Sequence, residues 1–153
     1  MKKIIYLTPL VVLVVVIFLF ILYAQHLGKQ VIYIKTAYNT HELSVDVADT
    51  DQERSRGLMG VENLADNEGM LFVYEQDVVT SYWMKDMKMP IDMIFINSDY
   101  KIEYIKKYAQ PCTPEFQQCP HYGTSVPIRY VLEVKAGFTE KNNLQIADEL
   151  IIK

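Results

Sequence analysis

A run of 21 residues without a charged side chain, from Ile4 to Ala24, constrains this chain of 153 residues more than any other feature. At a rise of about 1.5 Å per residue, a helix of that length spans roughly 30 Å, the hydrocarbon thickness of a bilayer. Lys2 and Lys3 precede the run, and positive residues tend to stay on the cytoplasmic side of a membrane. The sequence therefore predicts a cytoplasmic N-terminus (1–3), a single transmembrane anchor (4–24), a linker (25–30) and a domain outside the cytoplasm (31–153).

A cleavable signal peptide is the alternative interpretation of the same run. Signal peptides usually have a shorter apolar region, followed by small residues at the positions three and one before the cleavage point. The best candidate here is Leu22-Tyr23-Ala24, in which only the alanine is small. We therefore expect the segment to be retained, so that the chain is held in the cell membrane through residues 4–24.

The predicted domain is acidic. Of the fifteen lysines and arginines, three (Lys2, Lys3 and Lys29) precede residue 31, so that twelve basic residues face nineteen acidic ones in 31–153 and the formal charge is −7. Nucleic acids are bound mainly through basic surfaces that neutralise their phosphates. We therefore expect no nucleic-acid partner.

Short strands dominate the pattern of the domain. Residues 42–48 alternate polar and apolar side chains, which is typical of a strand with one buried face. Thr50 and Glu53 form a capping box that predicts one short helix over 51–59, ended by Gly60. The other predicted strands are 31–37, 70–74, 78–85, 92–96, 101–108, 129–135 and 149–152. We expect a mainly β domain, an antiparallel sandwich or jelly-roll-like barrel with one short α-helix.

The two cysteines, Cys112 and Cys119, lie in a proline-rich segment over 111–127. Outside the cytoplasm, two cysteines this close most simply form a disulfide, which would stabilise the fold by roughly 2–3 kcal/mol. The alternative is a metal site that adds His121. Its spacing is not that of a zinc ribbon and a fourth ligand is missing, so we predict the disulfide.

Five motifs follow one another along the chain in the order typical of a known family. They are Ala48-Asp49-Thr50 with Glu53-Arg54 and Gly57-Leu58-Met59; Gly69-Met70-Leu71-Phe72; Trp83-Met84-Lys85 with Pro90, Asp92 and Phe95-Ile96; Tyr130-Val131-Leu132-Glu133; and Gly137. Over 31–153 the chain thereby resembles the domain of unknown function 192 family. The resemblance implies a small jelly-roll-like β domain, commonly exported or membrane-anchored in bacteria and archaea, and it brings no activity. Met87, where threonine is usual, and Ala147-Asp148, where a glycine-aspartate pair is usual, depart from the family's pattern.

The charged residues of these motifs and the single tryptophan indicate a candidate ligand site. Guanidinium and ammonium groups hold oxygen atoms, and an indole face stacks on a ring, so the set suits an anionic or sugar-like ligand. The predicted ligand-binding residues are Arg54, Trp83, Lys85, Asp92 and Glu133. The structural alternative is an ion-pair lattice that ties the helix to the sheet, with Trp83 in the core.

A hydrolase is a second interpretation of the same motifs. Asp92 and Glu133 would serve as paired carboxylates if they lay about 5–10 Å apart in a cleft. The sequence has no nucleophile elbow, zinc-protease helix, phosphate-binding loop or dinucleotide fingerprint. We therefore predict a binding protein and keep an enzyme as the weaker alternative.

Copper binding is a third interpretation, because thioethers favour Cu(I). Four methionines lie within residues 81–96: Met84, Met87, Met89 and Met93. Methionines also fill irregular gaps in apolar cores, which is the simpler explanation. The leading prediction is a non-catalytic, membrane-anchored module without a cofactor that binds a small ligand, a glycan or an envelope protein.

Overall fold

The computed structural model describes residues 11–18, 28–112 and 118–153. Residues 11–18 are helical. Among the described residues, no helix has both the length and the apolar character needed to cross a membrane. Most of the predicted anchor at 4–24 lies outside these residues, so the anchor stays a prediction.

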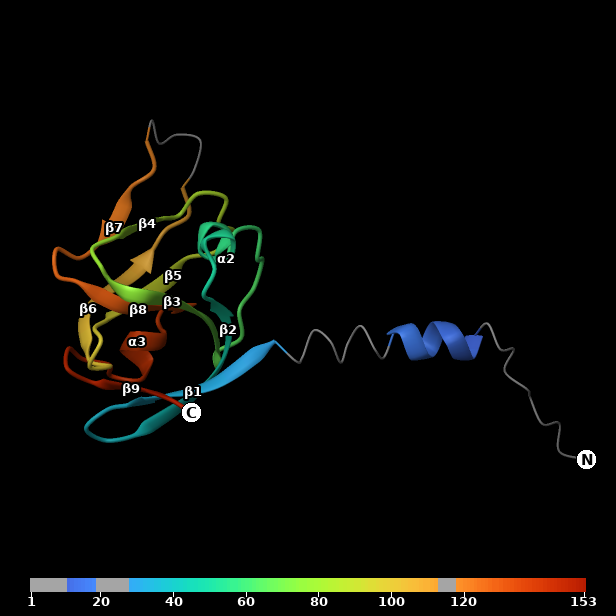
Figure 1. The fold of residues 1–153 in the computed structure, drawn as a ribbon, viewed down its shortest axis with the longest axis horizontal. Helices are drawn as coiled ribbons and strands as arrows, with labels where there is room; N and C mark the ends of the chain where they lie inside the picture. Colours follow the sequence, from blue (N-terminus) through green and yellow to red (C-terminus); the bar gives the residue numbers. More distant parts are fainter. Residues whose placement is uncertain (1–10, 19–27, 113–117) are drawn as a thin grey trace, which may run out of the picture.

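One sheet of seven strands forms the body of the β domain (Figure 1), with the strand order β6-β5-β8-β3-β2-β1-β9. The strands β4 and β7 form a separate two-stranded ribbon. The strand bounds are β1 Lys29–Lys35, β2 Thr40–Ala48, β3 Glu68–Val78, β4 Ser81–Trp83, β5 Ile91–Ile96, β6 Ile102–Ala109, β7 His121–Gly123, β8 Ile128–Lys135 and β9 Glu149–Ile152. Two short helices accompany them, α2 Asp51–Arg56 and α3 Phe138–Lys141. The prediction of a mainly β domain is confirmed.

The two edges of the large sheet approach each other. Lys101, just before β6, forms an isolated β-bridge with Glu149 of β9. The Leu150 N–H donates to the Tyr100 carbonyl oxygen at 2.8 Å, and the Ile102 N–H donates to the Asp148 carbonyl oxygen at 3.0 Å. The sheet therefore curls as a barrel does. The buried residues of this first core are Ile32, Ile34, Leu43, Val45, Leu71, Ile94, Ile96, Ile102, Tyr130, Leu132, Val134, Phe138, Leu144 and Leu150.

The structure differs from the predicted antiparallel sandwich or jelly-roll-like barrel in two respects. Strands β2 and β3 pair in parallel, with Val45 opposite Gly69, because α2 and residues 57–67 carry the chain back to the end at which β2 began. A parallel pair needs such a crossover. The layer that covers the sheet is also not a second full sheet; it consists of α2 and the β4–β7 ribbon.

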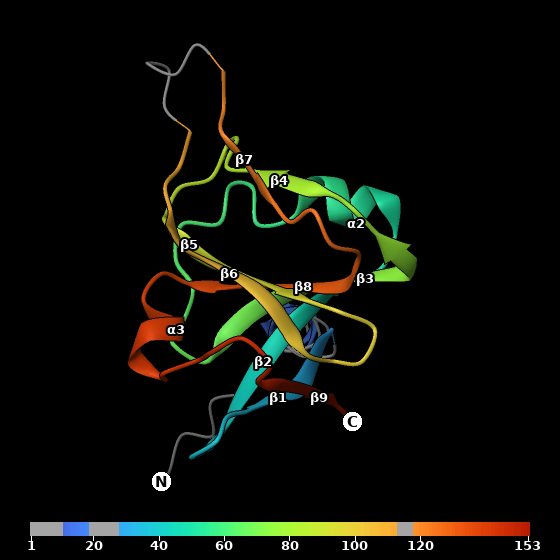
Figure 2. The ribbon, with the colours of Figure 1, turned by 90° about the vertical axis from the view of Figure 1, so that its left-hand side faces the viewer.

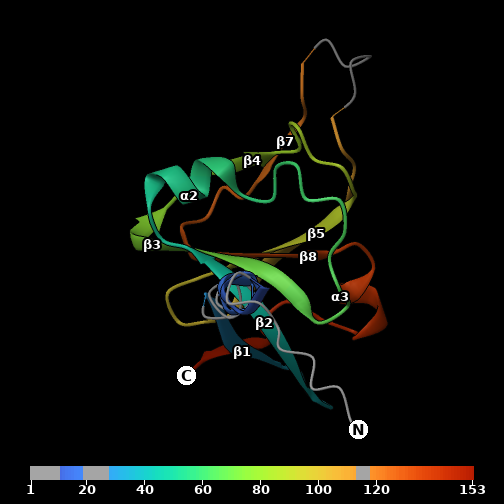
Figure 3. The ribbon, with the colours of Figure 1, turned by 90° about the vertical axis from the view of Figure 1, so that its right-hand side faces the viewer.

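A second core lies between the sheet and this cover. Figures 2 and 3 show α2 and the β4–β7 ribbon on the same side of β5, β8 and β3. The buried residues of the second core are Ala48, Leu58, Leu64, Phe72, Met84, Met87, Ile91, Met93, Phe95, Ala109, Ile128 and Val131. All six residues of β5 are buried, because the first core packs on one face of this strand and the second core on the other.

The helix α2 begins as the capping box predicts. The Glu53 N–H donates to the Thr50 hydroxyl, and the Glu53 carboxylate accepts from the Thr50 N–H. The helix ends at Arg56, earlier than predicted, because Gly57 adopts a positive φ of 48°. A Cβ at that position would lie 3.2 Å from the Phe72 ring. The turn after the helix therefore packs closely on β3, with Leu58 buried in the second core.

The cysteines form the predicted disulfide, with the Cα atoms of Cys112 and Cys119 separated by 5.5 Å. Both sulfur atoms are thereby used, and the described part of the chain contains no cluster of three or more histidine, cysteine, aspartate or glutamate side chains that would hold a metal. The prediction of a loop for the whole segment around the disulfide is wrong. Strand β7 forms at His121–Gly123 and pairs with β4.

Candidate functional site

A narrow pocket is lined by α2 and the turn that follows it, by β4 and by the surface of β8. Its volume is about 40 Å³. Four of the five predicted ligand-binding residues line it: Arg54, Trp83, Lys85 and Glu133. We call this the Glu133 pocket. The ligand-binding role of the four residues stays a prediction, but the fold brings them together from three segments that are distant in sequence.

Glu133 lies in the middle of β8, where its neighbours across the sheet are Met70 of β3 and Met93 of β5. Only 5 % of Glu133 is exposed. Within the described residues its side chain makes neither a hydrogen bond nor an ion pair, and burial raises the pKa of the Glu133 carboxyl to about 8. Glu133 is therefore a buried carboxyl, largely neutral near pH 7, that lines the pocket.

Gly69 allows β3 to run close beside this position. A Cβ on Gly69 would lie 2.6 Å from the Glu133 carbonyl oxygen and 3.2 Å from a Val134 methyl carbon. Real side chains do not tolerate a contact of 2.6 Å with backbone. The glycine that precedes Met70 in the family motif therefore keeps β3 and β8 paired next to the pocket.

Arg54 ties the helix to the sheet. Its guanidinium donates to the Val73 carbonyl oxygen at 2.8 Å and to the Asp51 carboxylate at 2.6 Å, and it also donates to the Asp49 carbonyl oxygen. It lies 5.1 Å from the centroid of the Tyr74 ring. Arg54 thus forms part of the pocket wall, but its charge and its donors are largely used within the fold.

Trp83 and Lys85 form the outer part of the pocket. Trp83 is 45 % exposed, so it is not in the core as the structural alternative required. The Lys85 ammonium lies 5.2 Å from the Trp83 ring centroid, and the His121 ring lies 5.8 Å from it. Lys85 and Arg56 are exposed, and neither forms an ion pair among the described residues. The predicted ion-pair lattice is therefore absent from the described residues, and within these residues no carboxylate pairs with the positive charges of Lys85 and Arg56 at the rim of the pocket.

Tyr82 forms an inner wall that the motif reasoning missed. Its hydroxyl lies 2.7 Å from that of Tyr74, and its ring packs edge-on against Phe72 and Phe95 at 5.1 and 6.0 Å. Burial, followed by the hydrogen bond to Tyr74, raises the pKa of Tyr82 above its ordinary value. Neighbouring residues of β4 point to opposite sides, so Trp83 points outward and Tyr82 inward. The inward position of Tyr82 could therefore have been predicted from the strand pattern. No sequence signal singles out Arg56.

Asp92 is the predicted site residue that lies elsewhere. It is fully buried and accepts four hydrogen bonds: from the Tyr108 N–H at 2.9 Å, the Gly137 N–H at 3.2 Å, the Thr139 N–H at 3.0 Å and the Thr139 hydroxyl at 2.6 Å. Asp92 therefore anchors the start of α3 to the sheet. The structure does not bring Asp92 to the Glu133 pocket with the other four predicted residues.

The paired-carboxylate arrangement of a hydrolase is not formed either. Glu133 lies opposite Met93, which belongs to the second core, whereas Asp92 lies opposite Val134, which belongs to the first core. Since neighbouring residues of a strand point to opposite faces, the two carboxyls are on opposite sides of the sheet. They do not share a cleft.

The methionines fill the second core. Met84, Met87 and Met93 are buried there and Met89 packs at its margin. Residues 84–90 form turns and not a strand, so Met87 and Met89 do not share the face of one strand. This arrangement favours gap filling over copper binding.

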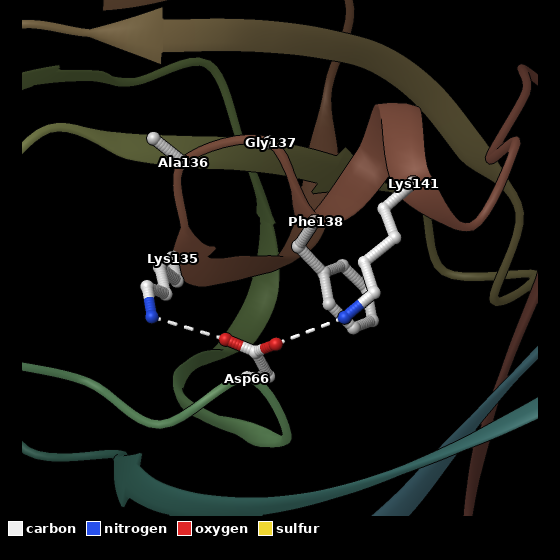
Figure 4. A pocket seen from close by; sticks show the side chains of 6 residues that line it. All are labelled: Asp66, Lys135, Ala136, Gly137, Phe138 and Lys141. Atoms are coloured by element: carbon white, nitrogen blue, oxygen red, sulfur yellow. Dashed lines mark hydrogen bonds and ion pairs between the residues drawn. The ribbon is translucent and has the colours of Figure 1, made fainter.

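A second pocket, of about 180 Å³, lies between Asp66 and the start of α3 (Figure 4). The Asp66 carboxylate accepts from the Lys141 ammonium at 2.9 Å and from the Lys135 ammonium at 3.0 Å. These two hydrogen bonds lower the pKa of Asp66 to about 2. The charged groups of this pocket satisfy one another, so it is the weaker candidate site.

A third pocket, of about 380 Å³, opens on the other side of the turn after α2. It shares the residues Arg56, Gly57, Leu58 and Met59 with the Glu133 pocket. The turn is therefore a common wall between the larger pocket and the narrow one.

The comparisons with known proteins give a family without an activity. The sequence profile of DUF192, described as "Uncharacterized ACR", matches residues 32–152. A solved structure from Sinorhizobium meliloti 1021, named as a candidate transcription regulator, is 32 % identical, with a TM-score of 0.74 over 80 % of this chain and 92 % of that chain. A protein of unknown function from Novosphingobium aromaticivorans DSM 12444 is 24 % identical, with a TM-score of 0.74 over 80 % of this chain and 84 % of that chain, and supports the fold alone. A search of the curated proteins gave no match. With the profile covering almost the whole β domain, the chain belongs to the DUF192 family.

Proposed function

We propose that the β domain is a non-catalytic module that binds a small ligand in the Glu133 pocket. One observation carries the proposal: a carboxyl that is more than nine-tenths buried and has no partner among the described residues lines a pocket beside a half-exposed tryptophan. Among the described residues, the only fully buried side-chain polar atom without a hydrogen bond is Nε2 of His41, so the Glu133 oxygens are open to the pocket. A ligand there can reach the carboxyl and form hydrogen bonds that the described residues do not supply.

The pocket divides into parts with different chemistry. Glu133 offers an oxygen and, in its neutral form, a proton at the floor. Phe72, Tyr82 and Met87 supply apolar walls, while Trp83 offers an exposed aromatic edge and face at the mouth. Apolar walls with a few converging polar groups are the usual composition of ligand sites.

The proposal includes the location of the domain. We infer a single-pass protein of the cell membrane, anchored by residues 4–24, with the domain outside the cytoplasm beside glycans and envelope proteins. The uncharged run, the lysines Lys2 and Lys3 before it and the disulfide between Cys112 and Cys119 support this inference.

The name of the Sinorhizobium relative raises a role in transcription. The formal charge of −7 over residues 31–153 argues against it, because binding to a nucleic-acid backbone requires a basic surface. A nucleic-acid partner is therefore not part of the proposal.

A thermal-unfolding screen tests the proposed site. The full chain, in a polyoxyethylene detergent that carries no sugar, is screened against sugars, nucleotides, metal ions and cell-wall fragments. A ligand of the Glu133 pocket should raise the melting temperature of the wild type, and this shift should be lost in Trp83→Ala and in Lys85→Ala.

The matched controls are Tyr38→Ala and Lys88→Ala, which change an exposed aromatic and an exposed lysine outside the pocket. Both controls should keep the full shift. A ligand that stabilises all variants equally binds elsewhere and contradicts the proposal. Variants Trp83→Ala and Lys85→Ala that unfold even without ligand would instead support a purely structural role.

A further inference from the structure

The size of the Glu133 pocket limits what can reach its floor. Its volume of about 40 Å³ is far smaller than the volumes of the second and third pockets, about 180 and 380 Å³. A narrow pocket of this kind admits a small group such as a hydroxyl to its floor more easily than a whole sugar ring. The greater part of any ligand must therefore lie outside, against Trp83 and the rim.

The surroundings of Glu133 decide which small group is favoured. Charged or titratable groups face it from α2 (Arg54 and Arg56), from β4 (Tyr82) and from the turn after β4 (Lys85), while its neighbours in β3 and β5 are the uncharged Met70 and Met93.

A neutral carboxyl presents one donor and one acceptor, which matches a hydroxyl. An ammonium group can only donate, so it would leave the O–H of the neutral carboxyl without an acceptor, and it would have to pass the positive rim.

The rim indicates the charge of the rest of the ligand. Arg56 and Lys85 are exposed and in no ion pair among the described residues, although the domain as a whole is acidic. Charge-assisted hydrogen bonds from such groups to a carboxylate are about twice as strong as neutral ones. Trp83 lies at the mouth beside Lys85, where its ring can cover the apolar face of a sugar.

We propose that the Glu133 pocket takes a sugar acid, which inserts one hydroxyl against the neutral Glu133 carboxyl, lies on Trp83 and presents its carboxylate to Arg56 and Lys85. This inference rests on the proposed function and names the ligand class for the same site. The sugar acid is either a free monosaccharide or the terminal unit of a glycan, because both present the same chemistry.

The single tryptophan of the chain, Trp83, provides the measurement. Its fluorescence is recorded for the full chain in the polyoxyethylene detergent during titration with galactose and with galacturonate and galactosamine, each of which differs from galactose in one substituent. Galacturonate should give a saturable change, and galactose and galactosamine should each bind about tenfold more weakly or not at all. Trigalacturonate that binds at least as tightly as galacturonate supports a glycan terminus, and binding of the monosaccharide alone supports a free sugar acid.

Variants assign the parts of the ligand. Glu133→Leu should abolish the binding of galacturonate. Arg56→Ala and Lys85→Ala should each lower the affinity for galacturonate about tenfold, whereas Lys88→Ala should leave it unchanged. The affinity of the wild type should fall between pH 6 and pH 9 as Glu133 ionises, whereas Glu133→Gln, which is neutral at every pH, should bind without this dependence.

Two results overturn the inference and leave the proposed site standing. One is tighter binding of galactosamine than of galacturonate; the other is no response to all three sugars while a ligand from the screen still requires Trp83 and Lys85. Binding of galacturonate that Glu133→Leu and Lys85→Ala leave unchanged overturns both the inference and the proposed site.

Discussion

Glu133 and Asp92 are both buried in central strands of the sheet, yet their surroundings differ completely. Asp92 accepts four hydrogen bonds, whereas Glu133 accepts none from the described residues. Donors to a carboxylate stabilise its charged form, and burial without donors favours the neutral form. One carboxyl is therefore part of the framework and the other is available to a ligand.

The raised pKa of Glu133 makes the stability of the domain depend on pH. The pKa of about 8 in the fold exceeds the ordinary value of 4.5. The contribution of the neutral carboxyl is therefore fully present below pH 4.5 and is lost as pH rises through about 8. A shift of this size corresponds to at most about 5 kcal/mol.

Glu133→Gln should remove this dependence. The free energy of unfolding in urea is measured for the wild type and the variant at pH 5, 7 and 9. Between pH 5 and pH 9 the variant should become more stable relative to the wild type by several kcal/mol. A difference between the two proteins that is the same at all three pH values would show that Glu133 is ionised in the fold.

Asp92→Ala should destabilise the domain by about 3–5 kcal/mol, because it leaves buried donors of Gly137, Thr139 and Tyr108 without an acceptor. The matched control is Asp99→Ala, whose side chain is exposed in a turn and should change stability by less than about 0.5 kcal/mol. Equal losses in the two variants, measured by urea unfolding, would contradict the anchoring role.

The sequence indicated Arg54, Trp83, Lys85 and Glu133 as neighbours because they recur in linked motifs, and the fold places all four around one pocket. It misplaced Asp92 for a physical reason. Strand β5 is buried on both faces, so its pattern has no alternation to show which way a side chain points.

At the scale of elements, α2 depends on its N-terminal cap. Thr50→Ala removes the hydroxyl that accepts from the Glu53 N–H and should destabilise the domain by about 1 kcal/mol. Gln52→Ala, an exposed position in the same helix, should change the free energy of unfolding by less than about 0.5 kcal/mol. The two values come from urea unfolding, and a cap variant as stable as the control would mean that packing alone holds α2.

The disulfide supports the β4–β7 ribbon. The Cys112 N–H donates to the Met84 carbonyl oxygen at 2.9 Å, directly beside Trp83 and Lys85. Replacing both cysteines with serine should lower the free energy of unfolding by roughly 2–3 kcal/mol. Reduction of the wild type should give the same loss and leave the double variant unchanged; a wild type insensitive to reduction would show that the bridge is absent in solution.

Elements defined by local signals were predictable, and those defined by distant pairing were not. The alternation in β2 and the capping box of α2 lie within a few residues and gave the right structures. The parallel pairing of β2 with β3 depends on the path of residues 57–67. Strand β7 consists of three residues in a proline-rich segment and exists only because β4 offers it a partner.

At the scale of the whole molecule, the sequence predicts two parts, a membrane anchor and a β domain, and these predictions depend on different signals. The fold class and the family followed from pattern and motifs, and the curled closure through Lys101 and Glu149 did not, because it joins segments without a local signal. The membrane location is a prediction from the uncharged run at 4–24.

Protease protection in cells tests that location. A chain that carries an epitope tag after Lys153 should lose the tag when protease is added to spheroplasts, because the domain lies outside the cytoplasm. The N-terminal sequence of the isolated protein should begin before residue 4. A tag that is protected until the membrane is permeabilised would contradict the predicted topology, and a chain that begins just after Ala24 would show a cleaved signal peptide.

The central claim is that Glu133 is a neutral carboxyl that awaits a ligand, and carbon NMR of its side chain tests it most directly. The Glu133 resonance, assigned by its absence in Glu133→Gln, should titrate near pH 8 in the free protein and should shift when galacturonate is added at pH 7. A resonance that titrates near the ordinary value of 4.5 and does not respond to galacturonate or to any ligand that stabilises the domain would contradict the account.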